Sequence, residues 1–430
     1  MNKLWNTAFV AILAVVVVFP GACSGSDNDE IIDETPIDTP EAAQEIEPVK
    51  ITIGNLTDLT GVSANALVDL DAALNDVVTY YNESNLIPGV ELEVIPYDTQ
   101  YEPARFIPGY EWLREKGADM IWNALPPGVT TLKSRANEDQ FPIFSATANV
   151  KPEELDGSYV FCLAIAPEYE AYTLLDWIAN NDPDFPTDRP AIIGGAAWSE
   201  AYSDIWFEAA KAYCAAHPDQ YEWEIDYLTH VKFNWETEVE GLKDCDYVYV
   251  PTPPQNFVKE YRQAGYTAKF LGTEVHAAFH GMIGKSQLWE EIDGMIFLLS
   301  AGWYNEDDPI MGLVNNLLDS YHSEDEANGF RINGGAYRAV MRINHLCEII
   351  QDAVENVGAK NFNTESLIDS AKSWTFNYKD VENFSNFTET KRFSQNYYAV
   401  FEVKVDSTNP HTWEYIIRAD DNWVSQVTNP

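Results

Sequence analysis

The sequence predicts an α/β protein with two lobes, each a mainly parallel sheet flanked by helices. Short apolar strands alternate with amphipathic helical runs between residues 50 and 149, and the same alternation restarts at residue 158. Strands that alternate with helical patterns at this spacing form βαβ units, whose parallel sheets are covered by helices. The chain is long enough for two such domains, and its 46% of apolar residues can fill two cores.

The first module consists of three repeats of strand, turn and helix, followed by a fourth strand. Its strands are expected at residues 51–56, 91–98, 119–124 and 141–144, and its helices at 64–81, 103–116 and 129–138. Parallel sheets of this kind bind ligands outside the carboxyl ends of their strands. The loops at 59–63, 123–128 and 145–149 should therefore lie at one end of one sheet and face a shared crevice.

The second module repeats the pattern. Its strands are expected at residues 158–164, 190–194, 222–227, 246–250 and 269–272, and its helices at 168–180, 204–215, 236–242 and 256–264. A long helix at 335–354 should return to the first module. Two adjacent strands at 397–405 and 413–419 are predicted to form an antiparallel pair.

The amino-terminal residues 1–22 have the features of an export signal. Lys3 supplies the basic end, and the apolar run at 8–19 is too short to span a membrane comfortably. The sequence Pro20-Gly21-Ala22-Cys23 resembles a bacterial lipoprotein processing site, which makes Cys23 the predicted lipidation site. The alternative is a plain secretory signal. Lipid chains on Cys23 would tether a soluble domain to a membrane surface.

Residues 23–49 are predicted to be an extended acidic linker. The stretch 24–48 holds nine carboxylates, three prolines and no basic residue, and such a segment repels itself and lacks apolar groups. The whole chain has a net charge of −43, which argues against nucleic acid as a partner. This charge fits a solvated acidic surface and favours cationic ligands weakly.

The cysteines other than Cys23 are scattered without the spacing of metal ligands. They are Cys162, Cys214, Cys245 and Cys347. Export permits disulfides, but the sequence does not choose partners, and buried free thiols are the expectation.

Four segments, taken in their order and spacing, resemble one known family. They are Ile53-Gly54 with Leu59-Thr60-Gly61, Tyr97 to Ala104, Lys116 to Asp119, and Phe141 to Thr147. The chain resembles the type I periplasmic binding proteins, in particular the branched-chain amino acid class of ABC-transporter substrate-binding proteins, over roughly residues 50–420. The resemblance implies two lobes joined by three crossover segments. Lobe 1 would comprise residues 50–150 and 301–385, and lobe 2 would comprise 151–300 and 386–425.

A zwitterionic amino acid needs donors for its carboxylate, and backbone N–H groups at loop ends suit this role. The resemblance implies that Ser145 and Thr147 supply backbone and hydroxyl donors. Alternatively, both residues cap the following turn. The companion loop departs from the family pattern, because Pro126 and Pro127 have no N–H to donate. Part of the expected carboxylate clamp is therefore missing, which does not favour a standard α-amino acid. Leu125 and Pro127 could instead present an apolar wall.

Four further residues are candidates by resemblance, each with an ordinary structural alternative. Tyr202 occupies the position where an aromatic ring covers the ligand, and Trp198 lies just before it; both could instead pack helix against sheet. Glu274 resembles the glutamate that holds the ligand ammonium, or it is a helix-terminal residue favoured by the dipole. Tyr337 resembles a helix start near the crevice, with core packing as the alternative.

The sequence gives little support to a metal site or to a catalytic site. His276 and His280 have the i, i+4 spacing of metal ligands but lack the inner glutamate of the zinc-protease helix. No G-x-S-x-G elbow, P-loop or dinucleotide-binding motif is present, so no catalytic residue and no cofactor is assigned.

The resemblance therefore implies an extracytoplasmic solute-binding lipoprotein without an activity of its own. It would capture a small polar or amino-acid-like ligand by lobe closure and deliver it to an ABC permease in the membrane. A ligand-sensing receptor ectodomain of the same fold is the alternative, and an exported hydrolase is a more distant one.

Overall fold

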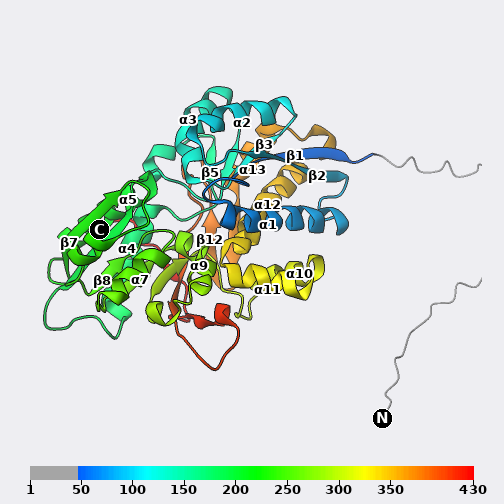
Figure 1. Cartoon of the computed structure of the whole chain (residues 1–430). Coiled ribbons are helices and arrows are strands. Elements are labelled where there is room, and N and C mark those ends of the chain that lie inside the picture. Colours follow the sequence, from blue (N-terminus) through cyan, green and yellow to red (C-terminus); the bar gives the residue numbers. More distant parts are fainter. Residues whose placement is uncertain (1–46) are drawn as a thin grey trace, which may run out of the picture. The chain divides into compact units, whose positions relative to one another are not determined.

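The structure, a computed structural model, describes residues 47–430 (Figure 1). These residues form two α/β lobes, one around a five-stranded sheet and one around an eight-stranded sheet. The predicted export signal, the lipidation site Cys23 and most of the predicted linker lie outside the described residues.

The sheet of lobe 1 has the strand order β2-β1-β3-β4-β5, and all neighbouring strands run parallel. The strands are β1 (Val49–Thr57), β2 (Val90–Asp98), β3 (Met120–Asn123), β4 (Ile143–Ser145) and β5 (Val160–Cys162). The sequence placed residues from 151 onward in lobe 2. However, Ile143 of β4 pairs with Val160 of β5, so the first lobe continues to the end of β5.

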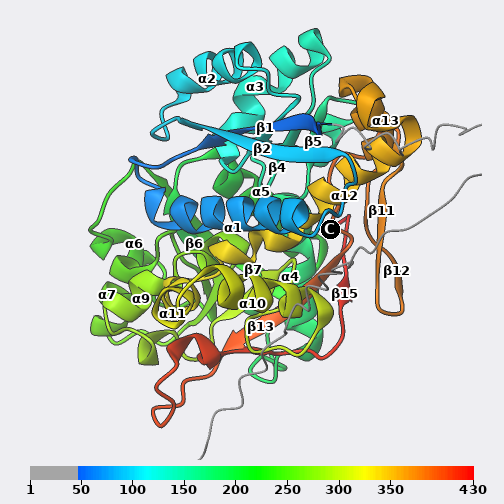
Figure 2. The same ribbon diagram turned by 90° about the vertical axis from the view of Figure 1, so that its right-hand side faces the viewer.

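Helices cover both faces of this sheet, as Figure 2 shows, with α2 and α3 above the strands and α1 and α12 below them. These helices are α1 (Ala64–Glu83), α2 (Pro103–Glu115), α3 (Pro126–Asp139) and α12 (Val340–Val357). Ile53 and Trp122 belong to the core on the α1 and α12 side, whereas Leu56 and Ile121 belong to the core under α2 and α3. Strands buried on both faces explain why their sequences are almost continuously apolar.

The sheet of lobe 2 has the order β14-β13-β10-β9-β8-β6-β7, with β15 also paired to β13. Its strands are β6 (Ala191–Trp198), β7 (Tyr221–Thr229), β8 (Tyr247–Tyr249), β9 (Lys269–Gly272), β10 (Ile296–Leu299), β13 (Tyr397–Val403), β14 (Ile416–Arg418) and β15 (Val424–Ser425). Strands β6 to β10 run parallel, and β13 is antiparallel to β10. The predicted antiparallel pair is confirmed as β13 and β14. β14 is shorter than expected, because Thr412–Tyr415 form a 3-10 helix.

Helices also cover both faces of the second sheet. Tyr247 and Tyr249 of β8 share a core with α4 (Pro167–Asn181) and α5 (Ala201–Ala216). Val248 points to the other side, with residues around α6 (Glu236–Gly241) and α7 (Gln255–Gln263). The remaining elements include α8 (Glu274–Ala277), α9 (His280–Lys285), α10 (Pro309–Tyr321), α11 (Glu324–Asn333), η3 (Ala336–Ala339), α13 (Thr364–Ser373) and the hairpin β11 (Thr375–Tyr378) with β12 (Val381–Asn386). Among the described helices, none is long and apolar enough to cross a membrane.

The four cysteines in the described part are free and buried, as the sequence predicted. Burial raises the pKa of the thiols of Cys162, Cys214, Cys245 and Cys347. Because the thiolate is the reactive form, these side chains act as small apolar residues of the core.

Three crossover segments join the lobes and lie side by side. They follow β5, follow β10 and precede β13. The Ser394 N–H donates to the carbonyl of Cys162 (2.9 Å), which ties the third crossover to the first. The Gln395 side-chain amide donates to the carbonyl of Ser300 (3.2 Å), which ties the third crossover to the second.

Arg392 fastens the third crossover to lobe 1. Its side chain is only 2% exposed and donates to four backbone carbonyls. Nε donates to Ser158 (2.6 Å), Nη1 to Thr388 (2.8 Å) and Lys391 (3.1 Å), and Nη2 to Glu389 (3.1 Å). The guanidinium also lies 4.6 Å from the centroid of the Phe161 ring. One buried cation thus satisfies carbonyls that no regular element pairs.

We predict that Arg392→Met lowers the free energy of unfolding by about 2–4 kcal/mol, because it leaves buried carbonyls without donors. Urea denaturation followed by tryptophan fluorescence measures the change. Arg189→Met is the control: Arg189 is half-exposed and pairs with Asp246 at the surface, so its loss should change the stability much less. Equal effects of the two substitutions would contradict the anchoring role of Arg392.

Candidate functional site

A cavity of about 550 Å³ lies between the lobes, at the carboxyl ends of strands from both sheets. Lobe 1 contributes the loops after β1, β3 and β4, which are the three loops that the sequence predicted to face one crevice. Lobe 2 contributes the loops after β6, β8 and β9. The lining residues from these six loops include Val62, Ser63, Ala124, Leu125, Pro126, Ala146, Thr147, Trp198, Ser199, Glu200, Thr252, Pro253, Glu274 and Val275.

The loop after β1 is shaped by the carboxylate of Asp58. This carboxylate accepts hydrogen bonds from the backbone N–H groups of Gly61 (2.5 Å) and Ser63 (2.8 Å). A Cβ atom on Gly61 would lie 2.5 Å from the carbonyl oxygen of Gln100, so only glycine fits this turn. The turn leads directly into α1 and places Val62 and Ser63 at the cavity.

The loop after β3 presents an apolar wall. Helix α3 begins at Pro126, where a missing N–H is tolerated because the first turn of a helix has no internal acceptors for it. Leu125 and Pro126 line the cavity. The sequence assigned this wall to Leu125 and Pro127; the structure instead places Pro126 there, with Pro127 one position further into the helix.

Of the two candidates after β4, Thr147 lines the cavity and Ser145 does not. Ser145 is fully buried as the last residue of β4. Its hydroxyl accepts from the side-chain amide of Asn123 (2.8 Å) and donates to the carbonyl of Thr147 (2.5 Å). Ser145 therefore holds the loop in shape, in line with the alternative that it satisfies the local turn.

Both aromatic candidates of lobe 2, Trp198 and Tyr202, line the cavity. The indole N–H of Trp198 donates to the carbonyl of Lys232 (3.2 Å), which fixes its ring at the end of β6. The Tyr202 hydroxyl donates to the carboxyl group of Glu170 on α4. Glu170 is fully buried, and burial raises its pKa to about 8, so it is largely protonated at neutral pH.

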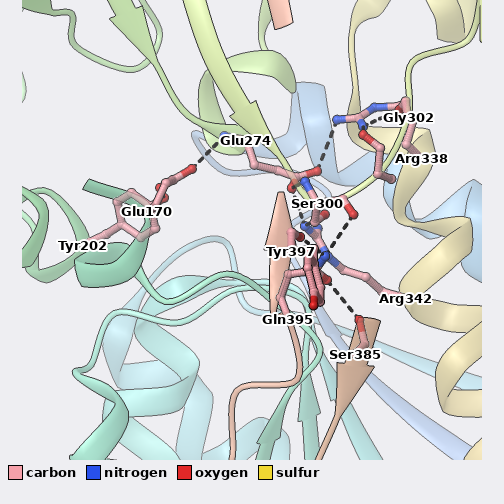
Figure 3. A network of polar contacts seen from close by, with 11 residues as sticks. Glu170, Tyr202, Glu274, Ser300, Gly302, Arg338, Arg342, Ser385, Gln395 and Tyr397 are labelled. Atoms are coloured by element: carbon pink, nitrogen blue, oxygen red, sulfur yellow. Dashed lines mark hydrogen bonds and ion pairs between the residues drawn. The ribbon is translucent and has the colours of Figure 1, made fainter. Parts of the chain in front are cut away.

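Glu274 lines the cavity as the first residue of α8, but its carboxylate is already engaged. Oε1 lies 3.2 Å from Nη2 of Arg338, and Oε2 lies 2.8 Å from Nη2 of Arg342. Oε2 also accepts from the Ser300 N–H (2.8 Å). Figure 3 shows the carboxylate between the Glu170–Tyr202 pair and the two guanidinium groups. Burial opposes ionisation, yet the two arginines and Ser300 hold the pKa of Glu274 below its usual value. This carboxylate is therefore not free to hold a ligand ammonium.

Tyr337 does not reach the cavity, contrary to its assignment as a ligand-binding residue. It belongs to η3, is fully buried, and donates from its hydroxyl to Asp76 of α1 (2.5 Å). Its ring packs on Phe330 at a centroid distance of 5.0 Å. Core packing, the alternative reading, is correct. The neighbouring Gly335 and Ala336 line the cavity in its place.

The two histidines at i, i+4 spacing lie in different helices and make different contacts. His276 in α8 has both ring nitrogens engaged, with the backbone N–H of Thr273 (3.0 Å) and the carbonyl of Val250 (2.8 Å). His280 starts α9 and packs against Phe297 at 4.9 Å. Burial lowers the pKa of His276 to about 4 and that of His280 to about 3, so both are neutral core residues.

Sequence reasoning missed several polar residues of the cavity, among them Arg342, Tyr101 and Glu200. The Tyr101 hydroxyl of lobe 1 donates to the Glu200 carboxyl group of lobe 2 (3.4 Å) and so bridges the cavity. Arg342 could have been noticed. It follows Arg338 by four residues, which places both cations on one face of an otherwise apolar helical run.

A second hollow, of about 620 Å³, lies at the amino ends of the lobe 2 strands, around Lys269, Asp246 and Glu402. Its central cation is already paired: the Lys269 ammonium lies 2.8 Å from Asp182 and 3.7 Å from Glu402. Ligands of parallel sheets bind at the carboxyl ends, so the cavity between the lobes is the better candidate.

Two α/β lobes, joined by three crossovers and facing each other across a cavity, define the class of two-lobed solute-binding proteins. The family model described as periplasmic binding protein matches residues 50–409, and the chain belongs to this family. The solved neighbours include branched-chain amino acid binding proteins of type I, as the sequence resemblance implied. No curated protein matches the sequence at a significant level.

Three solved structures illustrate the likeness in fold. A branched chain amino acid ABC transporter from Thermus thermophilus with bound valine has a TM-score of 0.72 at 17% identity, covering 89% of this chain and 97% of that one. A fatty acid ABC transporter substrate-binding protein from Thermomonospora curvata has a TM-score of 0.69 at 16% identity, with coverage of 86% and 91%. An extracellular ligand-binding receptor from Rhodopseudomonas palustris HaA2 has a TM-score of 0.66 at 16% identity, with coverage of 86% and 99%.

The raised pKa of Glu170 predicts a loss of stability with rising pH. The unfolded chain releases this proton near the ordinary value of 4.5, whereas the folded protein holds it up to about 8. The unfolded state therefore binds fewer protons between these values, and the free energy of unfolding falls as the pH rises. Between about pH 5 and pH 8, the free energy of unfolding of Glu170→Gln should therefore fall by about 3 kcal/mol less than that of the unsubstituted protein.

Urea midpoints measured across this pH range test the prediction. The control is Glu111→Gln, an exposed residue of α2 that should leave the pH profile unchanged. A Glu170→Gln profile parallel to that of the unsubstituted protein would show that Glu170 is not protonated in the folded state.

Proposed function

We propose that this protein is an extracytoplasmic solute-binding protein that traps a small organic ligand between its lobes and delivers it to an ABC permease. The observation that carries the proposal is the cavity formed at the carboxyl ends of strands from both sheets. Its volume of about 550 Å³ falls in the range of small-molecule sites. The family and its solved relatives are solute-binding proteins, which supports binding rather than catalysis.

Contacts across the cavity support a mechanism of lobe closure. Tyr101 donates to Glu200 across the gap, and the Lys151 ammonium of lobe 1 lies 3.0 Å from the carboxylate of Glu208 on α5. None of the four residues belongs to a crossover, and both pairs would separate if the lobes hinged apart. A ligand that contacts both walls shifts the equilibrium toward the closed form by its differential affinity for that form.

A thermal-shift screen across amino acids, amides, polyamines and organic acids identifies ligands, because a bound ligand raises the melting temperature. For any ligand found, Ala278→Trp should abolish the shift. Ala278 lines the cavity and is partly exposed, so a bulky ring at this position would fill ligand space. Ala278→Ser serves as the control and should bind normally. Unchanged affinity in the tryptophan variant would place the ligand elsewhere.

We further propose that Cys23 carries a lipid anchor and that the acidic stretch after it acts as a stalk. Cys23→Ser should release the exported protein from membranes into the soluble extracytoplasmic fraction without changing its ligand affinity, because the anchor lies outside the binding lobes. Cell fractionation with immunoblotting measures the distribution. Membrane retention of this variant at the level of the unsubstituted protein would contradict lipidation at Cys23.

A receptor ectodomain is the second candidate, supported by the fold likeness to the receptor from Rhodopseudomonas palustris HaA2. Delivery and sensing differ in the partner protein that recognises the closed form. Reconstituting the protein with a co-encoded permease and measuring ligand-dependent ATP hydrolysis separates the two, since a sensor would leave ATP hydrolysis unchanged.

A further inference from the structure

The wall of the cavity is mainly apolar, and its side chains come from both lobes. Leu67 and Leu70 of α1 and Leu125 line the cavity from lobe 1, together with Ile165 after β5 and Phe279 after α8. Such a surface favours an apolar ligand body, since each buried methylene group contributes about 0.8 kcal/mol to binding. Small polar solutes such as sugars would leave most of this wall without useful contacts.

One cation stands in this apolar setting. Arg342 lines the cavity, and only 12% of its side chain is exposed. Its Nη2 group is occupied by the Ser300 hydroxyl (2.7 Å) and by Glu274. Its Nε atom also has no hydrogen-bond partner among residues 47–430 but is enclosed by protein, whereas Nη1 makes no hydrogen bond within these residues and is not enclosed. A guanidinium with an unpaired N–H group beside a cavity favours an acceptor there, and a carboxylate is the strongest one available to a small ligand.

The charges around Arg342 do not cancel. Arg338 and Arg342 contribute two positive charges, and Glu274 contributes one negative charge, which leaves one positive charge (Figure 3). Glu170, the next carboxyl group in the network, is hydrogen-bonded to Tyr202 and to the Glu274 N–H (3.3 Å). Burial raises the pKa of Glu170 to about 8, so it adds no full negative charge at neutral pH.

Among the described lining residues, no carboxylate is well suited to a ligand ammonium. Glu274 is held by two arginines. Glu200 accepts the Tyr101 hydrogen bond, and burial raises its pKa, which weakens it as an anion. Glu102 is exposed to water, where a single ion pair contributes little.

The cavity is also polarised along its depth. Arg342 is largely buried, whereas Val62 of lobe 1 and Val231 of lobe 2 line the cavity with 71% and 62% of their surface exposed. The charged group therefore sits inside, and apolar side chains from both lobes stand at the opening. A ligand with one charged end fits this gradient with its charge innermost.

We propose that the ligand is a small monocarboxylic acid with an apolar body and no amino group, and that Arg342 binds its carboxylate. This inference rests on the proposed function as a solute-binding protein and names the ligand class of the same cavity. The apolar body would lie along the wall formed by both lobes, with its free end toward Val62 and Val231. Arg338 and Glu274 act as positioning residues that hold the Arg342 guanidinium at the cavity.

The test is isothermal titration calorimetry of the purified full-length protein with probes that share one apolar body and differ in the head group. Hexanoate, hexanamide, hexylamine and norleucine form one set; 3-phenylpropanoate and phenylalanine form a second. The carboxylates should bind at least about tenfold more tightly than the amide, the amine and the amino acids. Tighter binding of norleucine or phenylalanine, or binding of other solutes but of no carboxylate, would overturn this ligand class while leaving solute binding intact.

Substitution of Arg342 separates recognition from a structural role. Arg342→Gln should weaken carboxylate binding by about tenfold to hundredfold and leave hexanamide binding within about twofold. Arg342→Lys keeps the charge but loses the planar guanidinium with its several N–H donors, and should fall between these values. The Arg342→Lys variant also provides the test if Arg342→Gln does not fold. An equal loss for hexanoate and hexanamide would show that Arg342 only maintains the shape of the cavity. Absence of binding by every probe and every compound of the wider screen would instead refute the proposed function.

Discussion

The ion pairs of Glu274 with Arg338 and Arg342 connect the parts of this molecule that must cooperate. Glu274 begins α8, directly after a strand of the second sheet, whereas the arginines lie in η3 and α12, which pack against α1 of the first lobe. Ser300, at the start of the second crossover, donates to Glu274 and accepts from Arg342. Glu274 and Arg342 also face the cavity. The cavity and the second crossover therefore share one network of charged contacts.

Removing one member of such a buried network exposes the others to an uncompensated charge. The contribution of the network to stability therefore depends on the groups that contact Glu274, Arg338 and Arg342, as well as on the ion pairs between these three residues. Arg338 donates from Nη1 to the carbonyl of Gly302 (2.8 Å) and lies over the ring of Trp303 at 4.8 Å, so its position is fixed by the protein itself. Its guanidinium in turn helps to fix the Glu274 carboxylate, which lies beside Arg342.

Much of the architecture followed from sequence periodicity, and the shortfalls have physical causes. The alternation of apolar strands and helices predicted both sheets, because parallel strands buried on two faces leave a strong signal. The boundary at β5 was missed, because a three-residue strand does not reveal which sheet it joins until its partner is known. The loops at the cavity were found since their position follows from sheet direction alone. Individual side chains were harder to assign: Ser145 and Tyr337 are buried and form hydrogen bonds with Asn123 and Asp76, which are distant in the chain, and no spacing rule shows such pairs. The role of Glu274 changed because its partners are 64 and 68 positions away in the chain.

The position of β13 in the second sheet also determines when that sheet can form completely. β13 lies between β10 and β14, so the second sheet draws on residues from both the middle and the far carboxyl-terminal part of the chain. Before Tyr397–Val403 have been synthesised and have paired with β10, the edge of β10 has unpaired N–H and C=O groups. Such an exposed edge is prone to pair with other chains. The first sheet, in contrast, uses strands from one continuous stretch that ends at Cys162. A vectorially emerging chain would thus hold a finished amino-terminal sheet beside an unfinished one, a situation that favours protection by chaperones until the carboxyl-terminal strands arrive.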